Sequence, residues 1–169
     1  HEKFRHYFKD LGMGTETGID LPSEVAGNLR NIETSPRYIE YATASFGQGI
    51  AFSPINMTAA LAILANGGMT ITPHVVDEIR FASGKIKKIT TVPSAQVLKP
   101  ETTLTMTAIL TNGAQNGFAK SGKVPFHRIA GKTGTSQIAG PGGRYETGTG
   151  STVATYAGYA PVDRPRFVI

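Results

Sequence analysis

The chain has 169 residues, of which 40% are hydrophobic and 17% charged, and its formal net charge is +5 at pH 7. This length allows one domain with a real core, and the composition is that of an ordinary globular protein. No apolar run reaches the roughly 18 residues that predict a transmembrane helix. The basic residues are scattered apart from Lys85, Lys87 and Lys88, which favours a solvated strand edge over a nucleic-acid interface. The absence of Cys suits an oxidising compartment.

The first third of the chain predicts a helix followed by a long ordered loop. Apolar residues at helical spacing predict a helix over residues 1–11 that Gly12 ends. Its apolar stripe consists of Phe4, Tyr7, Phe8 and Leu11. Because no N-cap residue precedes it, we expect this helix to begin in a longer parent chain. Residues 12–31 are rich in Gly, Pro, Asp and Asn and predict a loop that buries Ile19, Leu21 and Val25.

A second helix is predicted over residues 54–65. Ser53 is a suitable N-cap, Pro54 fits the first helical position, and Asn-Gly-Gly at 66–68 ends the helix. We expect Met57, Leu61 and Leu64 to form its buried stripe. In the preceding segment, Gly47 and Gly49 are expected to permit a tight backbone path.

The rest of the chain predicts a hairpin, a third helix and a set of strands. Residues 74–81 and 86–92 are predicted to be two strands joined by a turn. Pro100 is predicted to begin a helix that reaches residue 113. Leu104, Ala108 and Thr111 share one face of that helix, and a polar loop is predicted over residues 114–123. Strands are predicted over residues 129–136 and 152–160, with a loop between them and a third strand beginning at residue 167, where the chain stops within the element.

The predicted strand at residues 129–136 concentrates the chemistry of the chain. It carries one ammonium group and three hydroxyls, from Lys132, Thr133, Thr135 and Ser136. The two-residue period of a strand places Lys132 and Gly134 on one face and the two threonines on the other. Gly134 leaves room for another chain to approach the backbone. An edge strand with free N–H groups, hydroxyls and an ammonium suits a peptide that ends in a carboxylate.

A phosphate-binding loop is the competing interpretation, because residues 131–133 read Gly-Lys-Thr. That motif needs a glycine where this chain has Phe126, and it needs a helix directly after the Lys-Thr pair. Gly134 and Thr135 are poor residues for the start of a helix. A nucleotide-binding function is therefore excluded.

Three sequence blocks together resemble the class B penicillin-binding proteins, which are single-function peptidoglycan transpeptidases. The blocks cover nearly the whole chain in the family's order: Gly12-Met-Gly with Thr17-Gly-Ile-Asp-Leu-Pro and Glu24, Ala44-Ser-Phe-Gly-Gln-Gly-Ile with Ser53-Pro and Ala65-Asn-Gly-Gly, and Ala130-Gly-Lys-Thr-Gly-Thr. The resemblance implies an α+β fold of the α/β sandwich type, in which an antiparallel sheet packs against helices. It implies no cofactor and no metal.

The resemblance also implies roles for the residues of the third block. Lys132 and Thr135 are expected to be catalytic, with Lys132 supplying positive charge for proton transfer and Thr135 supplying a backbone oxyanion donor. Thr133, Gly134, Thr135 and Ser136 are expected to bind substrate, and Thr135 is the best candidate for the terminal D-alanine or β-lactam carboxylate. Arg144 and Tyr145 either line the groove or belong to an ordinary loop.

The family's Ser-x-x-Lys and Ser-x-Asn motifs occur nowhere in the chain. We therefore expect residues 1–169 to be part of a transpeptidase domain that lacks these upstream motifs and the final strand and helix. The implied partners are stem peptides ending in D-Ala-D-Ala, β-lactams and proteins of a cell-wall synthesis complex, without nucleic acid and with membrane attachment only through an N-terminal anchor. The implied location is the extracytoplasmic face of the bacterial membrane. Residues 143–145 and 165–167 favour a septal enzyme, and an elongation-type enzyme is the alternative. The alternative is a non-catalytic module that binds peptidoglycan or a partner.

Overall fold

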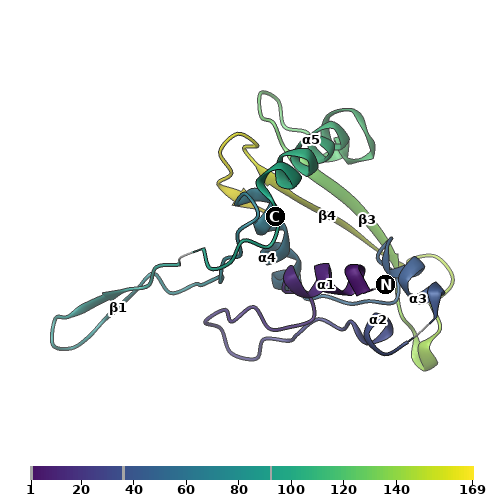
Figure 1. Ribbon diagram of the computed structural model, residues 1–169, viewed down its shortest axis with the longest axis horizontal. Coiled ribbons are helices and arrows are strands. Elements are labelled where there is room, and N and C mark those ends of the chain that lie inside the picture. Colours follow the sequence, from purple (N-terminus) through teal and green to yellow (C-terminus); the bar gives the residue numbers. More distant parts are fainter. Residues whose placement is uncertain (1, 36, 92) are drawn as a thin grey trace.

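The computed structural model describes residues 2–35, 37–91 and 93–169, which form helices and two antiparallel sheets (Figure 1). The predicted α+β class is confirmed. The α-helices are α1 (Glu2–Asp10), α2 (Arg30–Thr34), α3 (Tyr38–Ala44), α4 (Pro54–Ala65) and α5 (Pro100–Asn116), and two 3-10 turns are η1 (Phe118–Gly122) and η2 (Pro141–Gly143). The strands are β1 (Glu78–Arg80), β2 (Ile86–Lys88), β3 (Ala130–Gln137), β4 (Thr152–Ala160) and β5 (Phe167–Val168). Within the described residues, no helix is long and apolar enough to cross a membrane.

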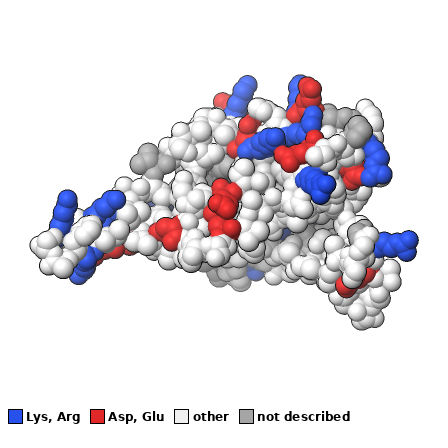
Figure 2. Space-filling model, turned by 90° about the horizontal axis from the view of Figure 1, so that it is seen from below, with Lys and Arg blue, Asp and Glu red and all other residues white. Residues whose placement is uncertain are grey.

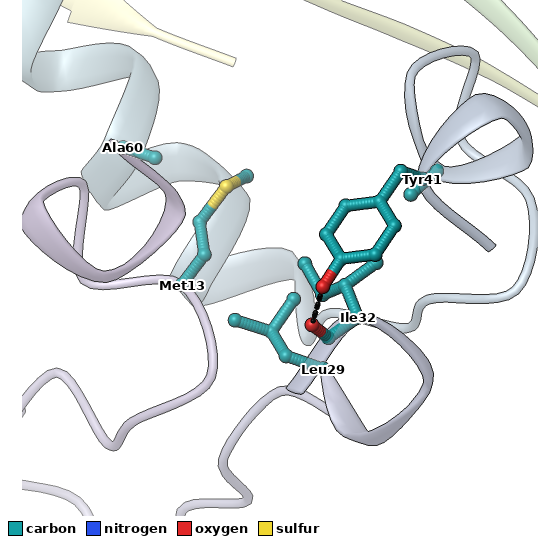
Figure 3. Close-up of a cluster of buried hydrophobic side chains, with 6 residues drawn as sticks. Met13, Leu29, Ile32, Tyr41 and Ala60 are labelled. Carbon is teal, nitrogen blue, oxygen red and sulfur yellow. Dashed lines mark hydrogen bonds between the residues drawn. The ribbon is translucent and has the colours of Figure 1, made fainter. Parts of the chain in front are cut away.

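The main apolar cluster lies where α1, α2, α3 and α4 meet. Its buried members are Met13, Leu29, Ile32, Tyr41, Ala44 and Ala60, and the partly buried Phe4, Phe8 and Leu11 of the α1 region pack against them. The hydroxyl of Tyr41 donates to the carbonyl oxygen of Ile32 at 2.8 Å, so the ring joins α3 to α2 (Figure 3). The predicted first helix is confirmed over its described residues, although Tyr7 is exposed. His1 lies outside the described residues.

The loop after α1 is ordered by a carboxylate instead of by the apolar residues we predicted. Leu21 and Val25 are exposed, so the expectation was wrong for these two residues, whereas Ile19 is partly buried. Glu24 accepts hydrogen bonds from the backbone N–H and the hydroxyl of Thr17 and from the N–H of Gly18, at 2.6–3.0 Å. These bonds join the two ends of the segment from Thr17 to Glu24, and they do not require Leu21 or Val25 to be buried.

The second predicted helix is confirmed as α4, but its buried face is not the one predicted. Ser53 caps the helix by accepting a hydrogen bond from the N–H of Asn56. Asn56, Ala60 and Ile63 are buried, whereas Met57 is exposed. The helix is apolar on nearly every side, so hydrophobicity alone does not mark the inner face. That face is set by Asn56, whose amide donates to the carbonyl oxygen of Thr15 at 2.8 Å.

Two short helices, α2 and α3, were not predicted from the sequence. The glycines that follow them behave as expected, because Gly47 and Gly49 both have positive φ angles, of 88° and 75°.

The predicted hairpin is confirmed as β1 and β2, and it stands out from the body as a long arm (Figure 1). The paired strands have three residues each and are shorter than predicted. Val92, at the predicted end of the second strand, lies outside the described residues. The base of the arm is held by Asp20, which accepts hydrogen bonds from the N–H groups of Val75 and Val76 at 2.7 and 2.9 Å.

Helix α5 is longer than predicted, and of its predicted face only Thr111 is buried. It continues to Asn116 and is followed by η1, so the predicted polar loop was wrong. Leu104 is exposed, and the buried residues are Thr103, Thr111 and Ala114. Thr103 can be buried here because its hydroxyl bonds to the preceding turn, donating to the carbonyl oxygen of Pro100 at 2.8 Å, whereas the buried hydroxyl of Thr111 has no partner among the described residues.

The second sheet has the order β3-β4-β5, with all neighbours antiparallel. Residue Ala130 pairs with Tyr159, and the register runs to Gln137 opposite Thr152. The three strands occupy the positions predicted for them within one or two residues. Among the described residues, β3 has a partner on one side only, so it is an edge strand.

Candidate active site

The sequence-predicted site residues all lie on β3, which is anchored at its N-terminal end. Ala130 is fully buried, and its cross-strand partner Tyr159 hydrogen-bonds through its hydroxyl to Thr107 on α5 at 2.6 Å. Burial raises the pKa of the Tyr159 hydroxyl, against the opposing effect of that hydrogen bond. Helix α5 therefore fixes the start of the strand, while the later residues extend away from the helix.

A tyrosine beneath the strand explains two of the glycines around it. The ring of Tyr156 lies so close to Gly131 that a Cβ on that residue would be 2.2 Å from the hydroxyl oxygen. A Cβ on Gly122 of η1 would be 2.3 Å from the same ring. The hydroxyl of Tyr156 is buried without a hydrogen-bond partner among the described residues, and burial raises its pKa. The ring therefore packs between β3 and η1 without a hydrogen bond from its hydroxyl.

The register shows which backbone groups of β3 face the open edge. The N–H of Ile138 donates to the carbonyl oxygen of Ser151 at 2.9 Å, on the β4 side. Backbone groups alternate between the two edges of an antiparallel strand, so even-numbered residues face β4. The N–H and C=O groups of Thr133 and Thr135 therefore point to the unpaired edge.

The side chains divide between the two faces as the sequence predicts. Lys132, Gly134 and Ser136 share one face, and Thr133 and Thr135 share the other. Lys132 and Thr135 are exposed, and Thr133 and Ser136 are partly buried. Lys132 Nζ donates to the carbonyl oxygen of Thr133 at 2.6 Å. Among the described residues no carboxylate forms an ion pair with Lys132, so its charge is available at the edge.

Gly134 has a packing role as well as the expected open approach. A Cβ at this position would lie 2.5 Å from the hydroxyl oxygen of Thr155 on β4. The contact is with the end of a side chain, which can rotate, whereas the Gly131 contact is with a fixed ring. Sequence reasoning missed Thr155 and Tyr156, although the glycines at 131 and 134 were a signal that side chains of the neighbouring strand lie close to them.

The loop after β3 turns back antiparallel to the residues that follow that strand. The N–H of Gly140 donates to the carbonyl oxygen of Arg144 at 2.8 Å, and the N–H of Glu146 donates to that of Ile138 at 2.9 Å. Ala139 and Tyr145 form an isolated antiparallel bridge. Arg144 and Tyr145 thus lie close to the C-terminal end of β3, and their place in a groove stays a prediction.

The geometry excludes the phosphate-loop interpretation and suits peptide binding. The chain after Lys132 and Thr133 continues as a strand to Gln137, where a phosphate loop would begin a helix. An open strand edge with free N–H groups, an unpaired ammonium and two hydroxyls can take an extended chain with a terminal carboxylate.

Comparison with known proteins shows the family to which a chain with this strand edge belongs. The family model for the penicillin binding protein transpeptidase domain matches residues 1–169. The chain is 35% identical over 171 residues to stage V sporulation protein D of Bacillus subtilis, and 31% identical over 184 residues to a peptidoglycan D,D-transpeptidase FtsI homolog of Mesostigma viride. Both alignments cover 99% of this chain, but only 26% and 30% of the relatives, so the chain spans less than a third of their length.

Solved structures give the same result. Penicillin binding protein 3 of Mycobacterium tuberculosis matches with a TM-score of 0.89 and 28% identity, over 99% of this chain and 39% of that one. Structures of that protein complexed with aztreonam and with ampicillin match equally well, with TM-scores of 0.89. The resemblance to class B penicillin-binding proteins is confirmed, and the chain belongs to the penicillin-binding protein transpeptidase family.

Proposed function

We propose that this chain is the part of a serine D,D-transpeptidase domain that binds the stem peptide, in an enzyme that cross-links peptidoglycan through an acyl-enzyme. The observation that carries the proposal is the open edge of β3, toward which the backbone of Thr135 faces beside the unpaired Lys132. The nucleophile would come from a Ser-x-x-Lys segment outside residues 1–169, because that motif does not occur here.

The residues of β3 would act by position and charge. A substrate strand ending in D-Ala-D-Ala adds to the open edge, and its backbone pairs with the outward N–H groups of Thr133 and Thr135 and with the carbonyl oxygen of Thr135. The N–H of Thr135, which faces the open edge, would serve as an oxyanion donor for the tetrahedral intermediate. Lys132 attracts the terminal carboxylate and favours proton transfer at the serine, and the two threonine hydroxyls hold that carboxylate. Gly134 and Ser136 complete the binding surface.

β-Lactams would bind the same edge, because their carboxylate and acyl group mimic the end of the stem peptide. The Mycobacterium tuberculosis protein of the same fold has been solved with aztreonam and with ampicillin, which supports this proposal. The domain would work at the extracytoplasmic face of a bacterial membrane, as part of a cell-wall synthesis complex. Assignment to the septal type stays a prediction from the sequence.

A non-catalytic module is the second candidate, favoured by the absence of both serine motifs from the chain. In that case β3 would bind peptidoglycan or a partner without acyl transfer. The two candidates differ in whether the gene encodes a Ser-x-x-Lys segment that acts together with this chain.

Labelling with a fluorescent penicillin tests the proposal on a denaturing gel. We expect the 169-residue chain to form no covalent adduct and the protein encoded by the whole gene to be labelled. A stable adduct on a serine of the chain itself would contradict the assignment of the nucleophile. Absence of labelling in both would favour the non-catalytic module.

A further inference from the structure

The arm formed by β1 and β2 carries most of the excess charge of the molecule. From the first residue of β1 to the last of β2, residues 78–88 contain four basic residues and one acidic residue, Glu78, whereas the whole chain has a net charge of +5. These four residues are Arg80, Lys85, Lys87 and Lys88. Blue side chains surround the far end of the arm in Figure 2. Arg80 pairs with Glu78 at the base of its strand, and the three lysines form no ion pair with any described residue.

Exposed apolar side chains alternate with these charges. Register pairs Ile79 with Lys87 and Arg80 with Ile86, so each pair shares a face. Ile79, Phe81 and Ile86 have exposed fractions of 40%, 46% and 52%. Each face of the hairpin therefore offers both apolar surface and positive charge.

Both edges of this two-stranded sheet lack a partner strand among the described residues. The N–H of Phe81 donates to the carbonyl oxygen of Lys85 at 2.9 Å, and the N–H of Ile89 donates to that of Asp77 at 2.8 Å. By alternation, the backbone groups of Ile86 and Lys88 point away from β1. The outer edge of β2 is thus a row of free donors and acceptors flanked by lysines.

The arm is mounted firmly enough to present this edge. Asp20 accepts both N–H groups of Val75 and Val76, and on the returning chain the N–H of Ser94 donates to the carbonyl oxygen of Thr70 at 3.1 Å. Both ends of the arm are therefore fixed to the body.

We propose that the outer edge of β2 binds an extended acidic segment of a partner protein, which adds as a third strand. Lysines on an edge strand usually prevent pairing between copies of the same chain, because equal charges repel. The same lysines favour a strand rich in Asp or Glu. A lipid surface is the poorer occupant, since it would leave the outward backbone groups of Ile86 and Lys88 without partners.

Fluorescence anisotropy with a labelled peptide that alternates Glu and Thr tests this proposal, with a Lys-Thr peptide as its charge-reversed counterpart. We expect the protein to bind the Glu-Thr peptide at low salt, to bind it more weakly as salt is added, and not to bind the Lys-Thr peptide. Lys85→Glu combined with Lys87→Glu should weaken binding about tenfold. The matched control, Lys120→Glu combined with Lys123→Glu, reverses two charges near η1 and should leave binding unchanged.

A proline variant separates strand addition from simple charge attraction. Ile86→Pro removes an outward N–H without changing the charge. The loss of this N–H is tolerated at a strand edge, where it has no partner within the sheet. We expect it to weaken binding by about tenfold, whereas Ile86→Ala, which removes only the side chain, should change binding less than about threefold. Circular dichroism would verify folding of each variant.

Four results would overturn the proposal: no binding of the Glu-Thr peptide, equal binding of the Lys-Thr peptide, full binding by folded Ile86→Pro, or tighter binding to phosphatidylglycerol vesicles than to the peptide. None of these readouts depends on transpeptidase activity, so the proposal can fail while the proposed function stands.

Discussion

Two tyrosines on β4 show how differently a hydroxyl can be placed. The hydroxyl of Tyr159 donates to Thr107 Oγ1, whose own proton goes to the carbonyl oxygen of Thr103, whereas the hydroxyl of Tyr156 is buried with no described partner. A buried polar group without a partner costs free energy, whereas a paired one makes a modest net contribution. The ring of Tyr156 supports β3, so it is the ring and not the hydroxyl that the site needs.

We predict opposite effects for the two Tyr→Phe substitutions on the free energy of unfolding. Tyr159→Phe should lower it by roughly 0.5–1.5 kcal/mol, and Tyr156→Phe should leave it unchanged or raise it slightly. Chemical denaturation of the two variants beside the unsubstituted protein measures both. A clear destabilisation by Tyr156→Phe would show that its hydroxyl has a partner.

The two glycines of the Gly-Lys-Thr-Gly sequence should also respond differently. Gly131→Ala places a methyl group against the Tyr156 ring and should destabilise the protein by about 1–3 kcal/mol. Gly134→Ala meets only the Thr155 hydroxyl, which can rotate, and should cost less. Thermal denaturation of both variants compares them. An equal loss of stability would contradict the conclusion that the Tyr156 ring packs tightly against Gly131.

At the scale of elements, two carboxylates fasten the loop after α1 and the base of the arm. Hydrogen bonds from the N–H groups of Val75 and Val76 hold the pKa of Asp20 below its ordinary value. The hydroxyl and N–H of Thr17, with other backbone groups, do the same for the pKa of Glu24. Because both pKa values are lower in the folded state, the stabilisation is complete above the unfolded values and is lost as pH falls through the folded ones.

We therefore predict that acid loosens the base of the arm before the core opens. Below about pH 4, amide exchange at Val75 and Val76 should speed up relative to amides of α4. Asp20→Asn should show faster exchange already at neutral pH, and that exchange should no longer respond to the titration of residue 20. Equal protection in the variant and the unsubstituted protein at pH 7 would contradict the role of Asp20.

The elements also show what the sequence could predict and what it could not. Ser53-Pro54 gave the right element because a helix cap is a local signal. The buried face of α4 was mispredicted because the helix is apolar all round and Asn56 is oriented by Thr15, 41 residues away. The edge position of β3 followed from its hydroxyls and glycines, but Tyr156 beneath it depended on strand register, which no local pattern reveals.

At the scale of the whole molecule, the surface is large for the mass. The accessible area is 11577 Å², whereas a compact monomer of 17.9 kDa is expected to expose about 8,000 Å². The arm accounts for part of the difference (Figure 1). Large apolar side chains on the body also face water, among them Phe118, Phe126 and Tyr38.

We predict that this chain self-associates when it is produced alone, because exposed apolar surface favours contacts between copies. Light scattering after size-exclusion chromatography should show species heavier than the monomer mass of 17.9 kDa. A clean monomer with a cooperative melt would contradict this expectation and would show that the exposed apolar residues are tolerated.

Our central claim is that the backbone N–H of Thr135, at the open edge of β3, is an oxyanion donor in the acylation reaction. Thr135→Pro removes its N–H at an unpaired edge, where proline is tolerated, and Thr135→Ala is the matched control that keeps the N–H. The measurement is the rate of acylation by a fluorescent penicillin in the protein encoded by the whole gene. We predict a loss of roughly a hundredfold to a thousandfold for the proline variant and a smaller loss for alanine. Equal acylation rates in the two folded variants would contradict the assignment of the Thr135 N–H as an oxyanion donor.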